Sequence, residues 1–112
     1  MAGTLDGIRV LDLSEYVSGP YCTKMLGAFG AEVIKIEKPG EGDSTRRMGP
    51  FLEDKPHLER SAPFLYLNTN KKGITLNLKS QAGLEIVKEL VKTADVLVEN
   101  FEPWVMPALE KG

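Results

Sequence analysis

The feature that most constrains the fold is a strand-like run, a helical run and a second strand-like run within the first 37 residues. Residues 8–13 (IRVLDL) are rich in branched apolar side chains, and residues 32–37 (EVIKIE) alternate between apolar and charged ones. Both patterns are typical of strands. The apolar residues between them recur at helical spacing, at Tyr21, Met25, Leu26 and Phe29. This order predicts two parallel strands joined by a right-handed crossover.

The limits of the first helix can be predicted from residues with known end preferences. Ser18 is expected to cap the helix, and Pro20 has the backbone angle favoured in a first helical turn. Gly30 can adopt the left-handed conformation that closes many helices. Cys22, between these limits, is expected to be a small buried spacer, with a reactive thiol as the alternative.

The second half of the chain predicts a hairpin, a helix and a further strand. Residues 64–67 (FLYL) and 74–78 (ITLNL) resemble short strands separated by a polar stretch, in which Gly73 can take a turn angle. Ser80 is a good cap for an amphipathic helix running to about Thr93.

Residues 95–99 (DVLVE) predict another strand after that helix, and Pro103 could begin a last helix. Strands that alternate with helices predict an α/β fold, here a Rossmann-like parallel sheet with flanking helices.

Composition narrows the classes of function. The chain has 112 residues, 42% of them hydrophobic and 27% charged, and a formal net charge of −2. This balance is typical of a globular protein and argues against nucleic-acid binding. The chain has no apolar run of membrane-spanning length and no signal-peptide pattern, so we expect a soluble, cytoplasmic protein without a membrane partner. Its single cysteine argues against an internal disulfide or a zinc site.

Residues 38–62 show little periodicity and contain three prolines and three glycines among many charges. A structureless stretch of this length in a compact domain is usually a binding loop or disordered, and we favour a binding loop. Within it, residues 39–43 (PGEGD) with Arg46 and Arg47 could hold an anion, because glycines expose backbone N–H groups and guanidinium groups grip phosphate or carboxylate. An ordinary charged surface loop is equally compatible with this composition.

Ligands of parallel α/β sheets bind where the strands end. Three such places are residues 15–20, 38–47 and 100–101. A dinucleotide-binding fold would need three glycines in the first loop, where this chain has only Gly19. Glu37 ends the second strand, where a ribose-binding acid would lie, but without those glycines a solvated strand end is favoured.

Five segments, in order and in register, resemble the family III coenzyme A transferases (CaiB/BaiF type). They are LDGIRVLDL from residue 5 followed by Gly19-Pro20, GAEVIKIE from residue 30, the loop Gly40-x-Gly42-Asp43-x-x-Arg46, NKKGITL from residue 70 and ADVLVENF from residue 94. The resemblance spans about residues 5–106. It identifies residues 1–112 as the N-terminal segment of a Rossmann-like large domain, with the remainder of the enzyme absent from this sequence.

The resemblance implies transfer of coenzyme A between carboxylic acids through an aspartyl-CoA thioester. The family's nucleophilic aspartate lies downstream of the matched segments, so we assign no catalytic residue within the 112 and expect the chain alone to be inactive. The implied substrates are an acyl-CoA and a carboxylic acid, with no tightly bound cofactor and no metal. The full-length protein is expected to form an interlocked homodimer. A 2-methylacyl-CoA racemase of the same fold and a non-catalytic nucleotide-binding or interaction module are alternatives.

The resemblance also implies the residues that line the coenzyme, by carry-over from the formyl-CoA transferase branch. They are Tyr16, Val17 and Ser18 in the first loop, then Lys38, Leu76, Lys79, Asn100 and Phe101. Lys38 and Lys79 can meet phosphates, and Leu76 can pack on adenine. The Asn100 amide can donate to and accept from pantetheine.

The first loop also departs from that branch. The branch has His-Val-Gln-Ala where this chain has residues 15–18 (EYVS). Since the glutamine of that branch lies beside the chemistry, the departure makes formyl-CoA and oxalate doubtful substrates and indicates another subgroup. The faces of Val96 and Val98 are expected to be exposed in the isolated chain, which should therefore associate.

Overall fold

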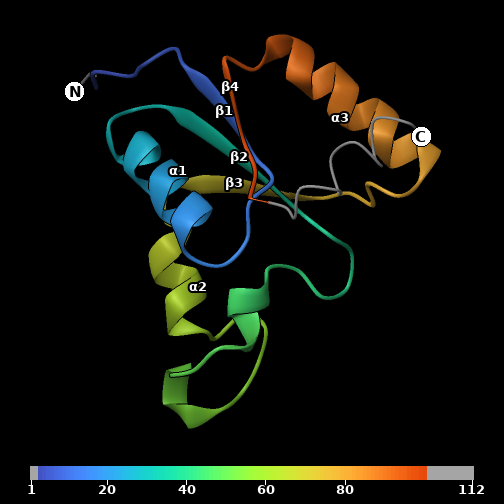
Figure 1. Cartoon of the computed structure of the whole chain (residues 1–112). Helices are drawn as coiled ribbons and strands as arrows, with labels where there is room; N and C mark the ends of the chain where they lie inside the picture. The colour runs from blue at the N-terminus through green and yellow to red at the C-terminus, as the bar shows by residue number, and fades with distance from the viewer. Residues whose placement is uncertain (1–2, 101–112) are drawn as a thin grey trace.

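The computed structural model describes residues 3–100 and shows a four-stranded parallel sheet with helices on both faces (Figure 1). The strands are β1 (Arg9–Asp12), β2 (Glu32–Glu37), β3 (Lys71–Thr75) and β4 (Val96–Val98), in the spatial order β3-β2-β1-β4. The helices are α1 (Ser18–Ala28), α2 (Ala62–Leu67) and α3 (Gln81–Thr93), with 3-10 turns at Ser44–Arg47 and Leu52–Asp54. The predicted α/β fold class is confirmed.

Alternation along the two central strands divides the core between the two faces of the sheet. Val10 and Val33 face α1, where they pack with Ala31 and Leu26. Leu11 and Ile36 face α3 and pack with Val87. Successive strand residues point to opposite faces, so helices on both faces require nearly continuous apolar strands. β1 and β2 pair in parallel from Arg9↔Glu32 to Asp12↔Lys35, as predicted.

The predicted hairpin is wrong. Residues 64–67 lie in α2, because Ser61 caps this helix by accepting a hydrogen bond from the Phe64 N–H and Pro63 occupies its first turn. The strand preference of the sequence FLYL is therefore overridden by a capped helix start. β3 instead pairs in parallel with β2, and Gly73 lies inside this strand opposite Lys35.

The helix ends agree with the sequence at Ser80 and Gly30 and disagree at Ser18. The Ser80 hydroxyl accepts a hydrogen bond from the Gly83 N–H at 3.0 Å, and α3 ends at Thr93 as predicted. Gly30 has a φ of 108° just after the end of α1. Ser18 is the first residue of α1 rather than its cap, which is Val17 with no side-chain capping bond.

The structure corrects two further expectations, and a third concerns residues outside 3–100. Cys22 is exposed on α1 rather than buried. Residues 38–62 are not structureless, because they contain both 3-10 turns. This segment is also tied together by the buried Ser61 hydroxyl, which lies 2.6 Å from the Thr45 carbonyl oxygen and 2.7 Å from that of Met48. The possible helix at Pro103 lies outside the described residues.

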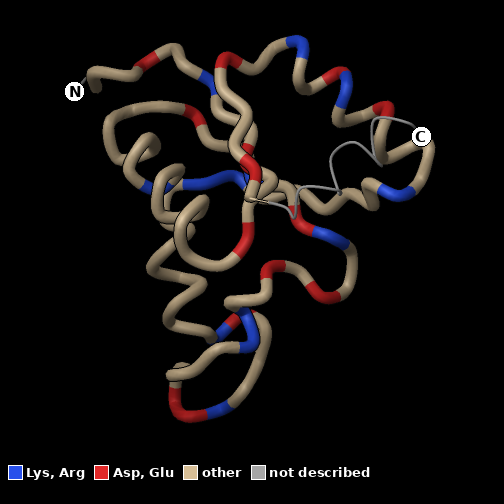
Figure 2. The backbone as a smooth tube through the Cα atoms, viewed as in Figure 1, with Lys and Arg blue, Asp and Glu red and all other residues tan. Residues whose placement is uncertain are grey.

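Charges of both signs are spread along the chain (Figure 2), in keeping with its near-neutral balance. None of the helices formed by residues 3–100 is both long and apolar enough to cross a membrane.

Candidate functional site

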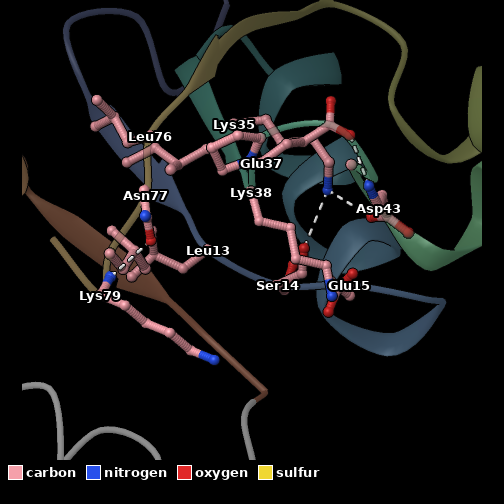
Figure 3. A pocket seen from close by; sticks show the side chains of 14 residues that line it. Leu13, Ser14, Glu15, Lys35, Glu37, Lys38, Asp43, Leu76, Asn77 and Lys79 are labelled. Atoms are coloured by element: carbon pink, nitrogen blue, oxygen red, sulfur yellow. Dashed lines mark hydrogen bonds and ion pairs between the residues drawn. The ribbon is translucent and has the colours of Figure 1, made fainter. Parts of the chain in front are cut away.

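A cavity of about 470 Å³ lies where the strands end (Figure 3). Its walls come from three segments that are far apart in the sequence, namely residues 13–15 after β1, residues 35–43 at the end of β2, and residues 76–79 after β3. Parallel strands bring their carboxyl ends to one edge of the sheet, so the three loops meet there.

The cavity combines an apolar surface with two exposed lysines. The apolar part is formed by Leu13, Ile36, Leu76 and Leu78. Lys38 is 3.3 Å from Glu41, but both side chains are more than half exposed, so this ion pair is weak. Lys79 makes no salt bridge with any residue in 3–100. The arrangement suits a ligand that has a flat apolar part and anionic groups.

The fully buried Asp12, the last residue of β1, holds the loop that follows this strand. Its carboxylate accepts hydrogen bonds from the N–H and hydroxyl of Ser14 and from the hydroxyl of Thr23, and forms an ion pair with Lys71 at 3.0 Å. Burial alone would raise the pKa of Asp12, but the Ser14 hydrogen bonds and the nearby lysines outweigh it and hold the pKa below its ordinary value. Asp12 therefore stays ionised and keeps Ser14 in place.

A second buried ion pair joins β2 to the segment that follows it. The Lys35 ammonium group lies 2.8 Å from Asp43 Oδ2 and donates a hydrogen bond of 3.0 Å to the Ser14 carbonyl oxygen. Asp43 Oδ1 accepts from the Thr45 N–H and hydroxyl, both at 2.8 Å, and from the Tyr16 N–H at 3.3 Å. Burial opposes ionisation of Asp43, yet the Lys35 and Thr45 hydrogen bonds hold its pKa below the ordinary value.

The guanidinium group of Arg46 is bound by the protein itself, so it is not free to hold an anion, whereas that of Arg47 is exposed and makes one hydrogen bond to the backbone. Arg46 donates to both carboxylate oxygens of Glu37, at 2.7 and 2.8 Å, and lies 3.7 Å from the centre of the Phe64 ring. Arg47 donates to the Glu41 carbonyl oxygen. Glu37 is thus neither a free ribose-binding acid nor a solvated strand end.

A glycine is required beside the Glu37–Arg46 pair. Gly42 has a φ of 68°, and a Cβ there would lie 2.5 Å from Glu37 Oε2 and 2.9 Å from Arg46 Cδ. Both the positive φ and the close approach of the pair favour a residue without a side chain.

Asn100 ties the loop after β4 to the loop after β1. Its side-chain amide donates to the Glu15 carbonyl oxygen at 2.7 Å and accepts from the Glu15 N–H at 3.0 Å. The Glu15 carboxylate in turn accepts from the N–H and hydroxyl of Ser44. Asn100 is therefore close to the predicted site, and its contact with pantetheine stays a prediction.

Of the predicted coenzyme-binding residues, the structure brings Lys38, Leu76 and Lys79 together in the cavity. Tyr16, Val17 and Ser18 are exposed and do not line it. Phe101 lies outside the described residues.

Sequence reasoning missed the roles of Lys35 and Asp43. A possible signal was the lysine within the otherwise apolar centre of residues 32–37, since a charge at a buried strand position needs a partner. No group of three His, Cys, Asp or Glu side chains among residues 3–100 is arranged to hold a metal ion.

Comparison with protein families gives a match that covers nearly the whole sequence. The model described as CoA-transferase family III matches residues 5–112. Over 106 residues, the chain is 51% identical to a formyl-CoA:oxalate CoA-transferase of Rhodopseudomonas palustris (strain BisA53), covering 95% of this chain and 24% of that protein. A formyl-CoA:oxalate CoA-transferase of Bradyrhizobium sp. (strain ORS 278) is 49% identical over the same length and share. The chain thus spans about a quarter of these relatives.

Solved structures show the same fold. The orthorhombic crystal structure of Rv3272 from Mycobacterium tuberculosis has a TM-score of 0.86 and 39% identity, covering 99% of this chain and 30% of that one. A CaiB/BaiF family protein from Brucella suis has a TM-score of 0.83, also with 39% identity, covering 99% of this chain and 28% of that one.

Proposed function

Since the chain belongs to CoA-transferase family III, we propose that it is the coenzyme-A-binding segment of an enzyme that moves coenzyme A between carboxylic acids. The substrates would be an acyl-CoA and a free acid, without a tightly bound cofactor. The full-length protein would form the interlocked homodimer that the resemblance implies.

The proposed reaction is nucleophilic catalysis by a carboxylate. An aspartate outside residues 1–112 attacks the thioester carbonyl, forming a mixed anhydride and releasing the coenzyme A thiolate. The thiolate then attacks the aspartyl carbonyl, which forms the aspartyl-CoA thioester and releases the donor acid as a carboxylate. The acceptor carboxylate then attacks the aspartyl thioester, which forms a second mixed anhydride and releases the thiolate. The thiolate attacks the acceptor's carbonyl carbon, so the acceptor leaves as its acyl-CoA and the aspartate is regenerated. Residues 1–112 would hold the coenzyme during this exchange.

The observation that carries the proposal is the pairing of an apolar cavity with Lys38 and Lys79. The apolar surface at Leu76 and Leu78 offers a packing face for the adenine ring. The two ammonium groups are exposed and can form charge-assisted hydrogen bonds with phosphate oxygens.

A calorimetric titration with coenzyme A tests binding. Because two phosphate contacts would be lost, the double variant Lys38→Ala/Lys79→Ala is expected to bind at least about tenfold more weakly than the wild type. The matched control is Lys55→Ala/Lys88→Ala, which removes the same charge from exposed residues outside the cavity and should change the affinity little. Equal affinities of the two double variants would contradict the proposed site.

The reaction is tested by incubating the full-length protein with an acyl-CoA and examining its intact mass. A transferase would accumulate a covalent adduct that adds the mass of coenzyme A less one water molecule, whereas a racemase of the same fold would not. Formyl-CoA with oxalate is the first pair to test despite the different first loop, since relatives of about 50% identity carry that name. Transfer of coenzyme A between two acids without any covalent enzyme adduct would contradict the proposed mechanism.

A further inference from the structure

Lys35 is a charged residue at the centre of a buried strand. Its side chain is 2% exposed, and its ammonium group reaches between Ser14 and Asp43 at the inner wall of the cavity (Figure 3). Burying an ammonium and a carboxylate costs more desolvation energy than packing apolar side chains of similar size, so stability alone is a weak reason for this pair.

The ammonium group joins two segments that both line the cavity. On one side it holds the Ser14 carbonyl oxygen in the loop after β1, and on the other it holds Asp43 in the segment after β2. Asp43 then accepts from the Tyr16 N–H, and Tyr16 has a φ of 65°, a conformation uncommon for residues other than glycine. One network of contacts thus fixes the conformation of the loop after β1 and its distance from the segment after β2.

We propose that Lys35 is a positioning residue, which sets the shape of the cavity by holding residues 14–16 against residues 43–45. This inference rests on the proposed function, because the shape of the cavity is tested through its affinity for coenzyme A. Lys35 acts through the two loops and is not required to touch the ligand.

The test compares variants of the full-length protein that contains residues 1–112. Lys35→Met removes the ammonium group and leaves Asp43 buried without its partner. Lys35→Met/Asp43→Asn removes both charges, so its stability should return toward that of the wild type while the link to Ser14 is still absent. Arg9→Met is the control, because Arg9 is also a strand cation in an ion pair, but its side chain contacts Glu32 and Thr93, neither of which lines the cavity.

Affinity for coenzyme A and melting temperature are measured for each variant. We expect both Lys35 variants to bind about tenfold more weakly, the change that follows from losing one charge-assisted hydrogen bond which orders the wall. The control should keep its affinity within about twofold. A double variant that recovers both stability and wild-type affinity would overturn the inference. If Lys35→Met does not fold, the double variant alone decides it.

Amide hydrogen exchange on the unliganded protein separates this inference from the proposed function. In the double variant, amides of residues 14–16 and 44–45 should exchange faster than in the wild type, with the remaining sheet and helices unchanged. Unaltered exchange in those two segments would overturn the positioning role. If calorimetry detects no binding of coenzyme A to the wild-type protein, the proposed function is refuted. The exchange data would still test whether Lys35 positions the two loops.

Discussion

Three carboxylates next to the cavity are ionised inside the fold, and this determines how single residues respond to acid. For Asp12, Asp43 and Glu37, burial by itself raises the pKa, but hydrogen bonds and nearby cations outweigh it, so each pKa lies below its ordinary value. The partners are Ser14 and two lysines for Asp12, Lys35 and Thr45 for Asp43, and Arg46 for Glu37.

The sign of the pH dependence follows from these lowered values. Below the ordinary carboxyl pKa of about 4, the unfolded chain binds protons that the folded chain does not, so the free energy of unfolding falls as the pH falls. We expect stability to be nearly constant from about pH 7 to pH 5 and to fall below that range. Urea unfolding of the wild type and of Asp43→Asn across this range is the measurement. The variant should be less stable at neutral pH and lose less on acidification, and equal slopes would contradict the low pKa of Asp43.

At the scale of elements, the starts of two helices predict effects of different size for the same substitution. Ser80→Ala removes the hydroxyl that accepts from the Gly83 N–H at the start of α3, so it should lower the free energy of unfolding by about 1 kcal/mol. Ser18→Ala removes an exposed hydroxyl that caps nothing in α1, so its effect should stay within about 0.5 kcal/mol. Denaturant unfolding at neutral pH distinguishes the two. A loss at Ser18 as large as that at Ser80 would show that Ser18 caps α1 in solution.

At the scale of the whole molecule, the edge strand β4 exposes apolar side chains. Among the described residues it pairs only with β1, and Val96 and Leu97 are 38% and 42% exposed. Val98, which was also expected to be exposed, is instead half-buried and packs against the cluster that contains Val10 and Val33. An unpaired edge with apolar side chains favours association with other chains.

We therefore expect the isolated 112-residue chain to associate, and Leu97→Lys to shift it toward the monomer. Ile86→Lys is the control, because Ile86 is equally exposed but lies on α3 rather than on a strand edge. Sedimentation velocity measures the distribution of species. A sharp monomeric boundary for the wild type would contradict the expectation.

Local pattern determined the elements whose signals lie within a few residues. The strand at residues 32–37, the cap at Ser80 and the left-handed Gly30 were predicted correctly, because each depends on the preferences of residues that lie close together in the chain. The parallel pairing of β1 and β2 followed from the order strand, helix, strand. Of the site, Lys38, Leu76 and Lys79 were predicted by resemblance, and the structure places all three in one cavity.

Tertiary contacts decided the remaining features. The strand position next to β2 is taken by Lys71–Thr75, so the sequence FLYL lies outside the sheet, in a helix that its local start at Ser61 and Pro63 favours. The partners of Arg46 and Lys35 could not be predicted from the sequence. A lysine or arginine that is solvated and one that forms an ion pair have the same local sequence signal, and only the folded chain shows which carboxylate lies nearby. The sequence by itself thus determined the elements and their order, whereas folding determined which buried charges meet, because that choice depends on distances between segments remote in the chain.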